Sequence, residues 1–258
     1  MRTACANWSS KPARRKTKTA RNRDGNGGNP DWHLGFLYKE WLGGFYPEKL
    51  PATKMLEYYS ERMPTVEINY TFRAMPKTQM LEGWASRTPP SFRFALKAPQ
   101  RITHFAKLRD VKETTDTFIE RAAVMGERCA PALFQLPPDL KLDLPLLRDF
   151  LMILKGRLRA AFEFRNPSWF DKSVMTALAD NGAALCIAET EKLASPIERT
   201  APYIYVRLRK ETYDDAGLDQ WAKNLNQLAS NANEIFVYFK HETSAPDLAT
   251  RLRAKLER

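Results

Sequence analysis

Polar or charged side chains recur at every second position in three otherwise apolar runs of the chain, and each run contains at least one charge. The charged residues are Glu67 in residues 65–69, Glu163 and Arg165 in residues 161–165, and Arg207 and Arg209 in residues 203–209. Because successive side chains of a strand point to opposite faces, each run predicts a strand with one apolar and one charged face. Guanidinium groups are typical of sites that bind phosphate or carboxylate, and a carboxylate beside them could transfer protons. The pattern therefore favours an anion-binding site with acid/base groups.

The candidate site is completed by residues at or just after the ends of other predicted strands. Glu67 and Glu163 are the expected catalytic acid/base groups, and His104 and His241, which follow strands, are the expected proton shuttles. The expected substrate-binding residues are polar side chains late in strands and one loop tryptophan, namely Asn69, Lys97, Gln135, Arg165, Glu189, Arg207, Arg209, Tyr238 and Trp169. A purely structural network of ion pairs is the alternative for any single residue, but perturbed buried charges cluster at functional sites.

Four aromatic residues outside the predicted strands have two interpretations. Trp41, Tyr46, Trp169 and Tyr213 could form a rim that stacks on a sugar or a base. They could equally pack over the end of the fold, and the sequence leaves both interpretations open.

The residues that could bind a metal disfavour a zinc site but are compatible with a site for a hard cation. The chain has three histidines without HxH or HExxH spacing, and its three cysteines, Cys5, Cys129 and Cys186, form no CxxC pair. One Mg²⁺ or Mn²⁺ ion held by Glu67, Glu163 or Glu189 is consistent with the preference of these ions for oxygen ligands. A divalent metal is thus an optional cofactor of the predicted site.

The elements that would position these residues alternate between short strands and helices. Strands are predicted at 65–69, 92–97, 132–136, 160–165, 184–189, 203–208 and 235–239, with a weak eighth candidate at 33–36. Apolar residues spaced three and four apart predict helices through 111–125 and 144–154, and leucines spaced by four predict a last helix through 248–256.

Repeated strand–helix units predict an α/β fold with a parallel sheet, either open and doubly wound or closed as a (β/α)8 TIM barrel. Neither GxGxxG nor GxxxxGK[ST] occurs, which disfavours the usual nucleotide-binding open sheets. A length of 258 residues suits a barrel. We therefore expect residues 31–258 to form a single TIM-barrel domain, with one helix missing or irregular between 189 and 203 and a weak first strand.

The composition and the N-terminal segment indicate where in the cell we expect the protein and which partners it could have. The chain is 43% hydrophobic but has no apolar run long enough for a membrane helix or a signal peptide, so we expect a soluble, cytoplasmic protein with no membrane partner. Residues 1–30 hold eight Lys or Arg and one Asp, which is most of the net charge of +11, and predict a disordered basic tail. The tail could contact nucleic acid, act in targeting or precede the functional start, so it gives nucleic-acid binding weak support. Nothing in the sequence indicates an oligomeric state.

Several longer motifs carry a family resemblance. They include Thr-Val-Glu-Ile-Asn-Tyr-Thr-Phe at 65–72, Leu-Phe-Gln-Leu-Pro-Pro at 133–138 and Phe-Glu-Phe-Arg-Asn-Pro-Ser-Trp at 162–169. With 38–47, 102–104, 205–209 and 237–242, they resemble the YecE-like family, also called domain of unknown function 72, over about residues 35–258. The resemblance implies a TIM barrel but no established reaction; likeness of such barrels to sugar isomerases and abasic-site endonucleases invites a nuclease interpretation. The family usually has a hydrophobic first strand that ends in a Gly-Thr-Ser-Gly-Trp-like turn, where this chain reads Asp-Trp-His-Leu-Gly-Phe-Leu at 31–37.

Three functions follow as hypotheses. The first is an enzyme that binds a small anionic substrate at the carboxyl ends of the strands and carries out acid/base or metal-assisted hydrolysis. The second is a glycosidase that uses Glu67 and Glu163 as its carboxylate pair, which pairing of both oxygens of either glutamate with arginine would oppose. The third is non-catalytic binding of nucleic acid or another ligand.

Overall fold

The computed structural model describes residues 35–230, 232–241 and 243–257. The predicted basic tail, residues 1–30, and the first half of the predicted eighth strand, residues 33–34, lie outside the described residues.

Seven strands and eight α-helices alternate along most of the described chain. The strands are β1 (Thr65–Ile68), β2 (Arg93–Leu96), β3 (Ala132–Gln135), β4 (Ala160–Glu163), β5 (Ala184–Glu189), β6 (Tyr203–Leu208) and β7 (Glu234–Phe239). The helices are α1 (Met55–Arg62), α2 (Tyr70–Arg73), α3 (Thr78–Ser86), α4 (Lys112–Ala123), α5 (Leu144–Leu154), α6 (Lys172–Asp180), α7 (Asp215–Ala229) and α8 (Ala245–Leu256). All seven strongly predicted strands are thus confirmed, and so are the three helices predicted from apolar spacing.

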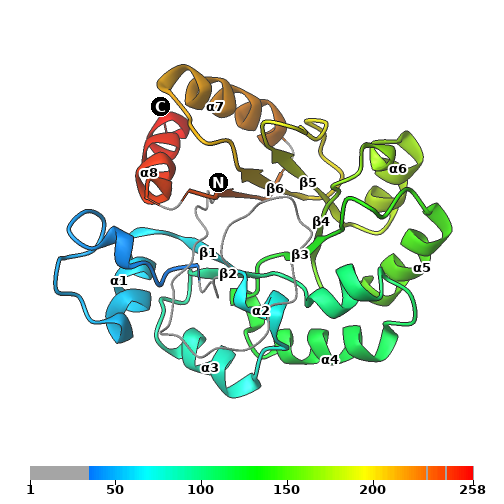
Figure 1. The fold of residues 1–258 in the computed structure, drawn as a ribbon, viewed down its shortest axis with the longest axis horizontal. Coiled ribbons are helices and arrows are strands. Elements are labelled where there is room, and N and C mark those ends of the chain that lie inside the picture. Colours follow the sequence, from blue (N-terminus) through cyan, green and yellow to red (C-terminus); the bar gives the residue numbers. More distant parts are fainter. Residues whose placement is uncertain (1–34, 231, 242, 258) are drawn as a thin grey trace, which may run out of the picture.

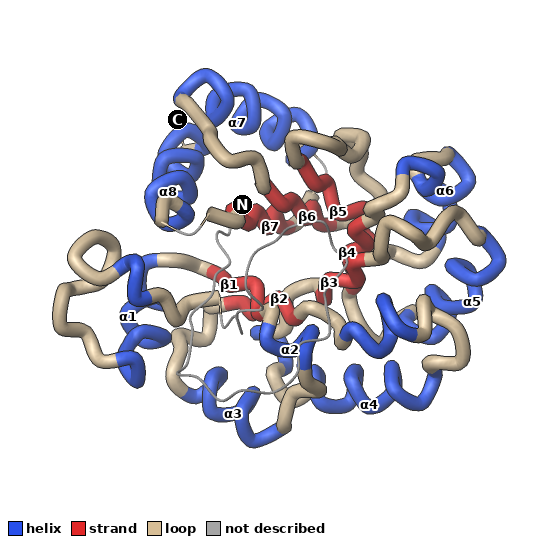
Figure 2. Tube along the Cα trace, viewed as in Figure 1, coloured by secondary structure: helices blue, strands red, loops and turns tan. Residues whose placement is uncertain are grey.

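The strands pair in parallel and in chain order. β1 pairs with β2, and β3 to β7 form a second sheet in the order β3-β4-β5-β6-β7. Two isolated parallel bridges, Phe94 to Cys129 and Lys97 to Leu133, connect β2 with the β3 region. Figure 2 shows the strands around the centre of the molecule, with the helices outside them. The fold is therefore mixed α/β with parallel sheets, while the strand pairing of the described residues does not show a closed eight-stranded barrel.

The predicted eighth strand is wrong for the part that can be examined. Gly35 and Phe36 form a turn instead of a strand. This turn lies close to β1, because a Cβ atom at Gly35 would be 2.3 Å from the carbonyl oxygen of Glu67. The Tyr46 hydroxyl donates to the Phe36 carbonyl over 2.5 Å. The segment thus packs against β1 without joining the described ladders.

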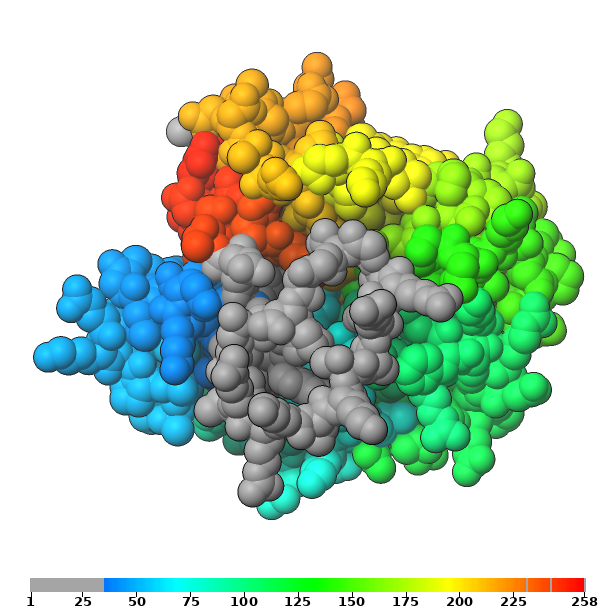
Figure 3. Space-filling model, in the orientation of Figure 1, coloured from blue at the N-terminus to red at the C-terminus, as the bar shows by residue number. Residues whose placement is uncertain are grey.

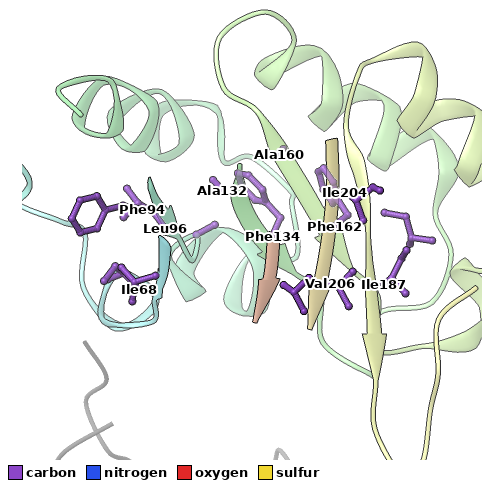
Figure 4. Close-up of a cluster of buried hydrophobic side chains, with 14 of the residues drawn as sticks. Ile68, Phe94, Leu96, Ala132, Phe134, Ala160, Phe162, Ile187, Ile204 and Val206 are labelled. Atoms are coloured by element: carbon purple, nitrogen blue, oxygen red, sulfur yellow. The ribbon is translucent and has the colours of Figure 1, made fainter. Parts of the chain in front are cut away.

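Strand side chains alternate between two separate apolar cores. One set of alternate positions, which includes Ile68, Phe134, Phe162 and Val206, belongs to the large core shared with the helices (Figure 4). The other set forms a smaller interior core from β2 to β7 that contains Ala95, Leu133, Ala161, Ala184, Cys186, Tyr205 and Phe236. Because the interior core draws on six strands, those strands surround one shared interior.

Three of the helices, α5, α6 and α7, begin at aspartates whose side chains cap them. Asp143, Asp171 and Asp214 accept hydrogen bonds from backbone N–H groups in the first turns of α5, α6 and α7, and so satisfy donors that the helix itself cannot. Between β5 and β6 the chain forms no helix, as the polar crossover predicted. Figure 1 shows the helices following one another around the strands, and the sequence colours of the space-filling view in Figure 3 run around the molecule in the same order.

None of the helices in the described part of the chain is both long enough and apolar enough to cross a membrane.

Candidate functional site

Arg207 joins two buried glutamates at the carboxyl-terminal end of the interior. Its Nη2 donates to Glu67 Oε1 over 2.8 Å, and its Nη1 donates to Glu163 Oε2. Glu67 is in β1, Glu163 in β4 and Arg207 in β6, so strands from across the interior meet here. All three side chains are almost completely buried. The arrangement follows from the alternation in each run, which directs these residues to the interior face.

Glu163 is the most heavily bonded group of the network. Its Oε1 accepts hydrogen bonds from Gln135 Nε2 at 2.7 Å, Arg165 Nε at 2.6 Å and Arg209 Nη1 at 3.2 Å. With Arg207 on Oε2, both carboxylate oxygens contact guanidinium groups. Gln135 reaches Glu163 because the two residues lie opposite one another in the parallel register of β3 and β4.

The charges fix the protonation states of this pair. Burial alone would raise the pKa of Glu163, but Arg207 and Arg165 outweigh burial and lower that pKa well below the usual range. Burial alone would lower the pKa of Arg207, but Glu163 and Glu67 raise it well above its ordinary value. Glu163 is thus a permanent carboxylate at neutral pH, and its role is to hold arginines rather than to donate a proton.

Lys97 follows β2 and meets the network through a neutral amide. Its Nζ donates to Gln135 Oε1 over 2.9 Å and lies 4.0 Å from the centre of the Phe72 ring. Gln135 therefore bridges Lys97 and Glu163 through the two ends of its side-chain amide. Lys97 is buried, with 8% of its surface exposed.

His104 lies next to this part of the network. Its ring meets the Phe72 ring edge-on at 4.9 Å, and its Nδ1 is 2.9 Å from the Thr103 hydroxyl. The residue is half-buried in a π-helical turn, Arg101–Phe105, a geometry that is frequent at functional sites. Lys107, Leu108 and Asp110 then have positive φ angles, which is a strained backbone for side chains of these types. The β2–α4 loop is thus the most irregular segment that borders the network.

Of two further predicted residues, Tyr238 lies on the interior face. Tyr238 of β7 is 3.0 Å from the Thr65 hydroxyl of β1 through its own hydroxyl, so it connects the last and first described strands. Asn69 directly follows β1 and precedes α2, where it is half-buried.

Tyr205 belongs to the network although it was not among the predicted site residues. The Tyr205 hydroxyl donates to Glu67 Oε2 over 2.7 Å. Tyr205 shares a strand face with Arg207, so the same alternation that singles out the arginine is the signal that could have found it.

Glu189 does not join the network, contrary to prediction. It occupies the last position of β5, where the interior positions are Ala184, Cys186 and Ala188, so its side chain lies on the opposite, helix-facing side. There it accepts from Trp221 Nε1 at 3.0 Å and pairs with Lys210 Nζ at 2.7 Å.

Trp169 and the expected aromatic rim are also placed elsewhere. The Trp169 indole is fully buried, stacks on Phe164 at 4.9 Å and donates to the Leu140 carbonyl over 2.7 Å. Trp41 and Tyr46 are likewise buried in the large core, and Tyr213 packs on Phe239. These aromatic residues support the loops by packing and do not form an exposed stacking surface.

His241 lies apart from the two glutamates. Its ring is 5.7 Å from Tyr213, and its Nε2 is buried without a hydrogen-bond partner among the described residues. Burial lowers the pKa of His241, so its imidazole is neutral at physiological pH. The predicted proton shuttles are thus separated, and only His104 borders the Lys97 end of the network.

The carboxylates are not arranged as a metal site. Within residues 35–257, apart from the undescribed positions 231 and 242, no three His, Cys, Asp or Glu side chains group so that they could hold an ion. Glu163 has both oxygens committed to guanidinium groups, and Glu189 lies on the other face of its strand. The oxygen ligands that the sequence suggested for Mg²⁺ or Mn²⁺ are therefore not brought together.

The motifs that build this network are those of a known family. The family model described as protein of unknown function DUF72 matches residues 33–258. The chain belongs to the DUF72 family. Among curated relatives, it is 34% identical to the UPF0759 protein YecE of Escherichia coli (strain K12) over 118 residues, which are 45% of this chain and 43% of YecE. It is 24% identical to the UPF0759 protein YunF of Bacillus subtilis (strain 168), over 82% of this chain and 89% of YunF.

Solved structures of DUF72 family proteins share the fold. A DUF72 family protein from Thermotoga maritima MSB8 superposes with a TM-score of 0.75 at 24% identity, covering 87% of this chain and 97% of that chain. One from Enterococcus faecalis V583 superposes with a TM-score of 0.70 at 19% identity, covering 80% and 94%. These similarities establish the α/β fold of the DUF72 chain, and the family name states no reaction.

Proposed function

We propose that this DUF72 protein is an enzyme that binds a small substrate carrying a phosphate or a carboxylate at the carboxyl ends of its strands. The observation that carries the proposal is the charge of the network. Three guanidinium groups, those of Arg165, Arg207 and Arg209, converge on two carboxylates, Glu67 and Glu163. The cations exceed the carboxylates that hold them, and an anionic ligand would complete the balance.

The outer arginines have the geometry of ligand-binding groups. The Arg165 and Arg209 side chains are 30% and 13% exposed, whereas Arg207 behind them is 3% exposed. The Nε of Arg209 is buried and has no hydrogen-bond partner among the described residues. A buried N–H without an acceptor costs about 1–3 kcal/mol. A phosphate or carboxylate oxygen between these two arginines would supply the missing acceptor.

The fold supports the same location. We propose that the parallel strands, which surround one interior core and meet through Thr65 and Tyr238, form a TIM barrel. In barrels of this type the active site lies at the carboxyl ends of the strands. The network lies at those ends, because Glu67, Lys97, Gln135 and Glu163 are among the last residues of their strands or the first after them.

The chemistry we propose is acid/base catalysis, of which the hydrolysis expected from the sequence is one case. Glu163 would position Arg165, Arg207 and Arg209, since its low pKa makes it a poor proton donor. His104 would carry the proton, because its half-buried ring packs on Phe72 at the Lys97 end of the network. The glycosidase alternative loses support, since both oxygens of Glu163 contact arginines.

Calorimetric titration with inorganic phosphate and with acetate tests the proposal. Arg209→Gln removes an outer guanidinium and should weaken binding by about 10- to 150-fold, which corresponds to a charge-assisted hydrogen bond of about 1.5–3 kcal/mol. The matched control is Arg159→Gln, which removes an arginine that pairs with Glu234 at the opposite, amino-terminal end of β4. The control should bind like the wild type. Equal affinities of the two variants, or absence of binding by the wild type, would contradict the proposal.

A further inference from the structure

The amine of Lys97 has an unusual environment for a lysine. Its Nζ contacts the face of Phe72 and one neutral acceptor, Gln135 Oε1, and no carboxylate of the described residues forms an ion pair with it. A buried ammonium without a carboxylate is costly, and a lysine in this position instead loses its proton. The geometry therefore favours the uncharged form of this amine, which lies just after the carboxyl end of β2.

The charges around Lys97 also lower its pKa on balance. The charged groups that face it are Arg207 of β6, Glu163 and Arg165 at the end of β4, and Lys240 after β7. Three of these four groups are cations. Burial first, and then the charge of Arg207, lower the pKa of Lys97 well below that of a free lysine. Desolvation beside other cations is one of the ways in which enzymes activate a lysine as a nucleophile.

We propose that Lys97 is an amine nucleophile that forms an imine with a small aldehyde or ketone carrying a phosphate or a carboxylate. The lone pair of Nζ attacks the carbonyl carbon, and a proton passes from the nitrogen to the carbonyl oxygen to give a carbinolamine. The nitrogen then forms a double bond to that carbon as the hydroxyl group leaves with a proton as water. No oxidant or reductant is needed. The inference rests on the proposed function, because Arg165 and Arg209 would hold the anionic group of the substrate.

The surroundings of Phe72 provide an approach to the amine. Phe72 also lines a surface hollow of about 660 Å³, together with Arg73, Arg101 and Phe105. The hollow borders the π-helical turn that contains His104. The half-buried Phe72 ring thus contacts both the hollow and the Lys97 amine.

Reductive trapping of the full-length protein tests the inference. The protein is incubated at neutral pH with glycolaldehyde phosphate or with glyoxylate, each in the presence of sodium cyanoborohydride, and is then measured by intact mass and by peptide mapping. Reduction of an imine adds the mass of the probe less one oxygen atom. We expect one equivalent of label on Lys97 with at least one of the two probes, and the more efficient probe identifies the anionic group. Glycolaldehyde, which lacks the phosphate, should label Lys97 at least about 10-fold more slowly, since it forms no charge-assisted bond with the arginines.

Two variants control for folding and for reactions of other lysines. Lys97→Arg keeps a cation and Lys97→Met removes it, and neither can form the imine. Both should lose the label while they retain the circular dichroism spectrum of the wild type. If one of them fails to fold, the wild-type peptide map still locates the label.

The outcomes separate this inference from the proposed function. Label confined to surface lysines, together with calorimetric binding of inorganic phosphate, would overturn the role of Lys97 and leave the anion site in place. Label on Lys97 at the same rate from glycolaldehyde and from glycolaldehyde phosphate, without binding of phosphate, would overturn the anion site. Site-specific label that depends on the phosphate or carboxylate would support both.

Discussion

The substitution Arg207→Met should unfold the protein far more easily than loss of any exposed arginine. Arg207 is 3% exposed and pairs with two carboxylates that are completely buried. In the variant, Glu163 keeps Gln135, Arg165 and Arg209, but Glu67 loses its guanidinium partner and keeps the Tyr205 hydroxyl. Removing one partner of a buried ion pair costs about 3–5 kcal/mol, because the remaining buried charge loses its counter-charge.

The size of the effect can be assigned to Glu67 with a second substitution. Glu67→Gln in the Arg207→Met background removes the buried charge that has lost its guanidinium partner, and it leaves a group that Tyr205 can still bond. The double variant should therefore be more stable than Arg207→Met by about 1–3 kcal/mol, the cost of a buried polar group left without its partner. Such recovery is a signature of a direct pair, since independent sites would add their losses.

Urea unfolding followed by circular dichroism at pH 7 measures these free energies, with the dependence on urea checked for each variant. Arg159→Met is the control, because Arg159 also pairs with a glutamate but its side chain is 39% exposed. The control should lose at most about 1 kcal/mol. A loss of under about 1 kcal/mol in Arg207→Met, or a double variant less stable than both single variants, would refute the view of a buried Glu–Arg–Glu network.

Three further predictions follow from the same contacts. Although burial raises it, Arg207 and Arg165 lower the folded-state pKa of Glu163 below the unfolded value of about 4.3. The stabilisation that Glu163 contributes is thus present above that pH and is lost as the pH falls further. Glu163→Gln should flatten the acid side of a plot of unfolding free energy against pH, and a plot parallel to that of the wild type would contradict this. Burial lowers the folded-state pKa of Lys97, so this residue destabilises the protein at neutral pH and does so less near pH 10. Lys97→Met should therefore raise the melting temperature by more at pH 7 than at pH 9.5. A melting temperature of the variant below that of the wild type at pH 7 would disprove the neutral amine. Trp169→Ala should lower the free energy of unfolding by about 3–5 kcal/mol and leave the phosphate affinity of the folded variant unchanged in calorimetry. A loss of phosphate affinity without a loss of stability would instead show that the indole contacts the bound anion.

Much of the interior could be predicted from the sequence because the signal is local. Charges at alternate positions of an apolar run can be buried only on one face of a strand, so Glu67, Glu163 and Arg207 identify the interior side without knowledge of their partners. The position of Gln135 beside Glu163 then follows from the parallel register.

The residues that were misplaced depend on information that a local pattern does not contain. All positions of β5 before Glu189 are apolar, so its sequence shows no alternation, and only the interior core of Ala184, Cys186 and Ala188 reveals which face Glu189 occupies. Trp169 is placed by long-range contacts with Leu140 and by stacking on Phe164, which its residue type does not specify.

We expect above all that an anion binds between Arg165 and Arg209. Anomalous X-ray diffraction from crystals equilibrated with selenate, a heavy-atom analogue of an oxyanion substrate group, would locate it directly. We expect the strongest anomalous peak within hydrogen-bond distance of both guanidinium groups, where Arg209 Nε lacks an acceptor among the described residues. Selenate peaks only on the outer surface, with none at the carboxyl ends of β4 and β6, would contradict the account.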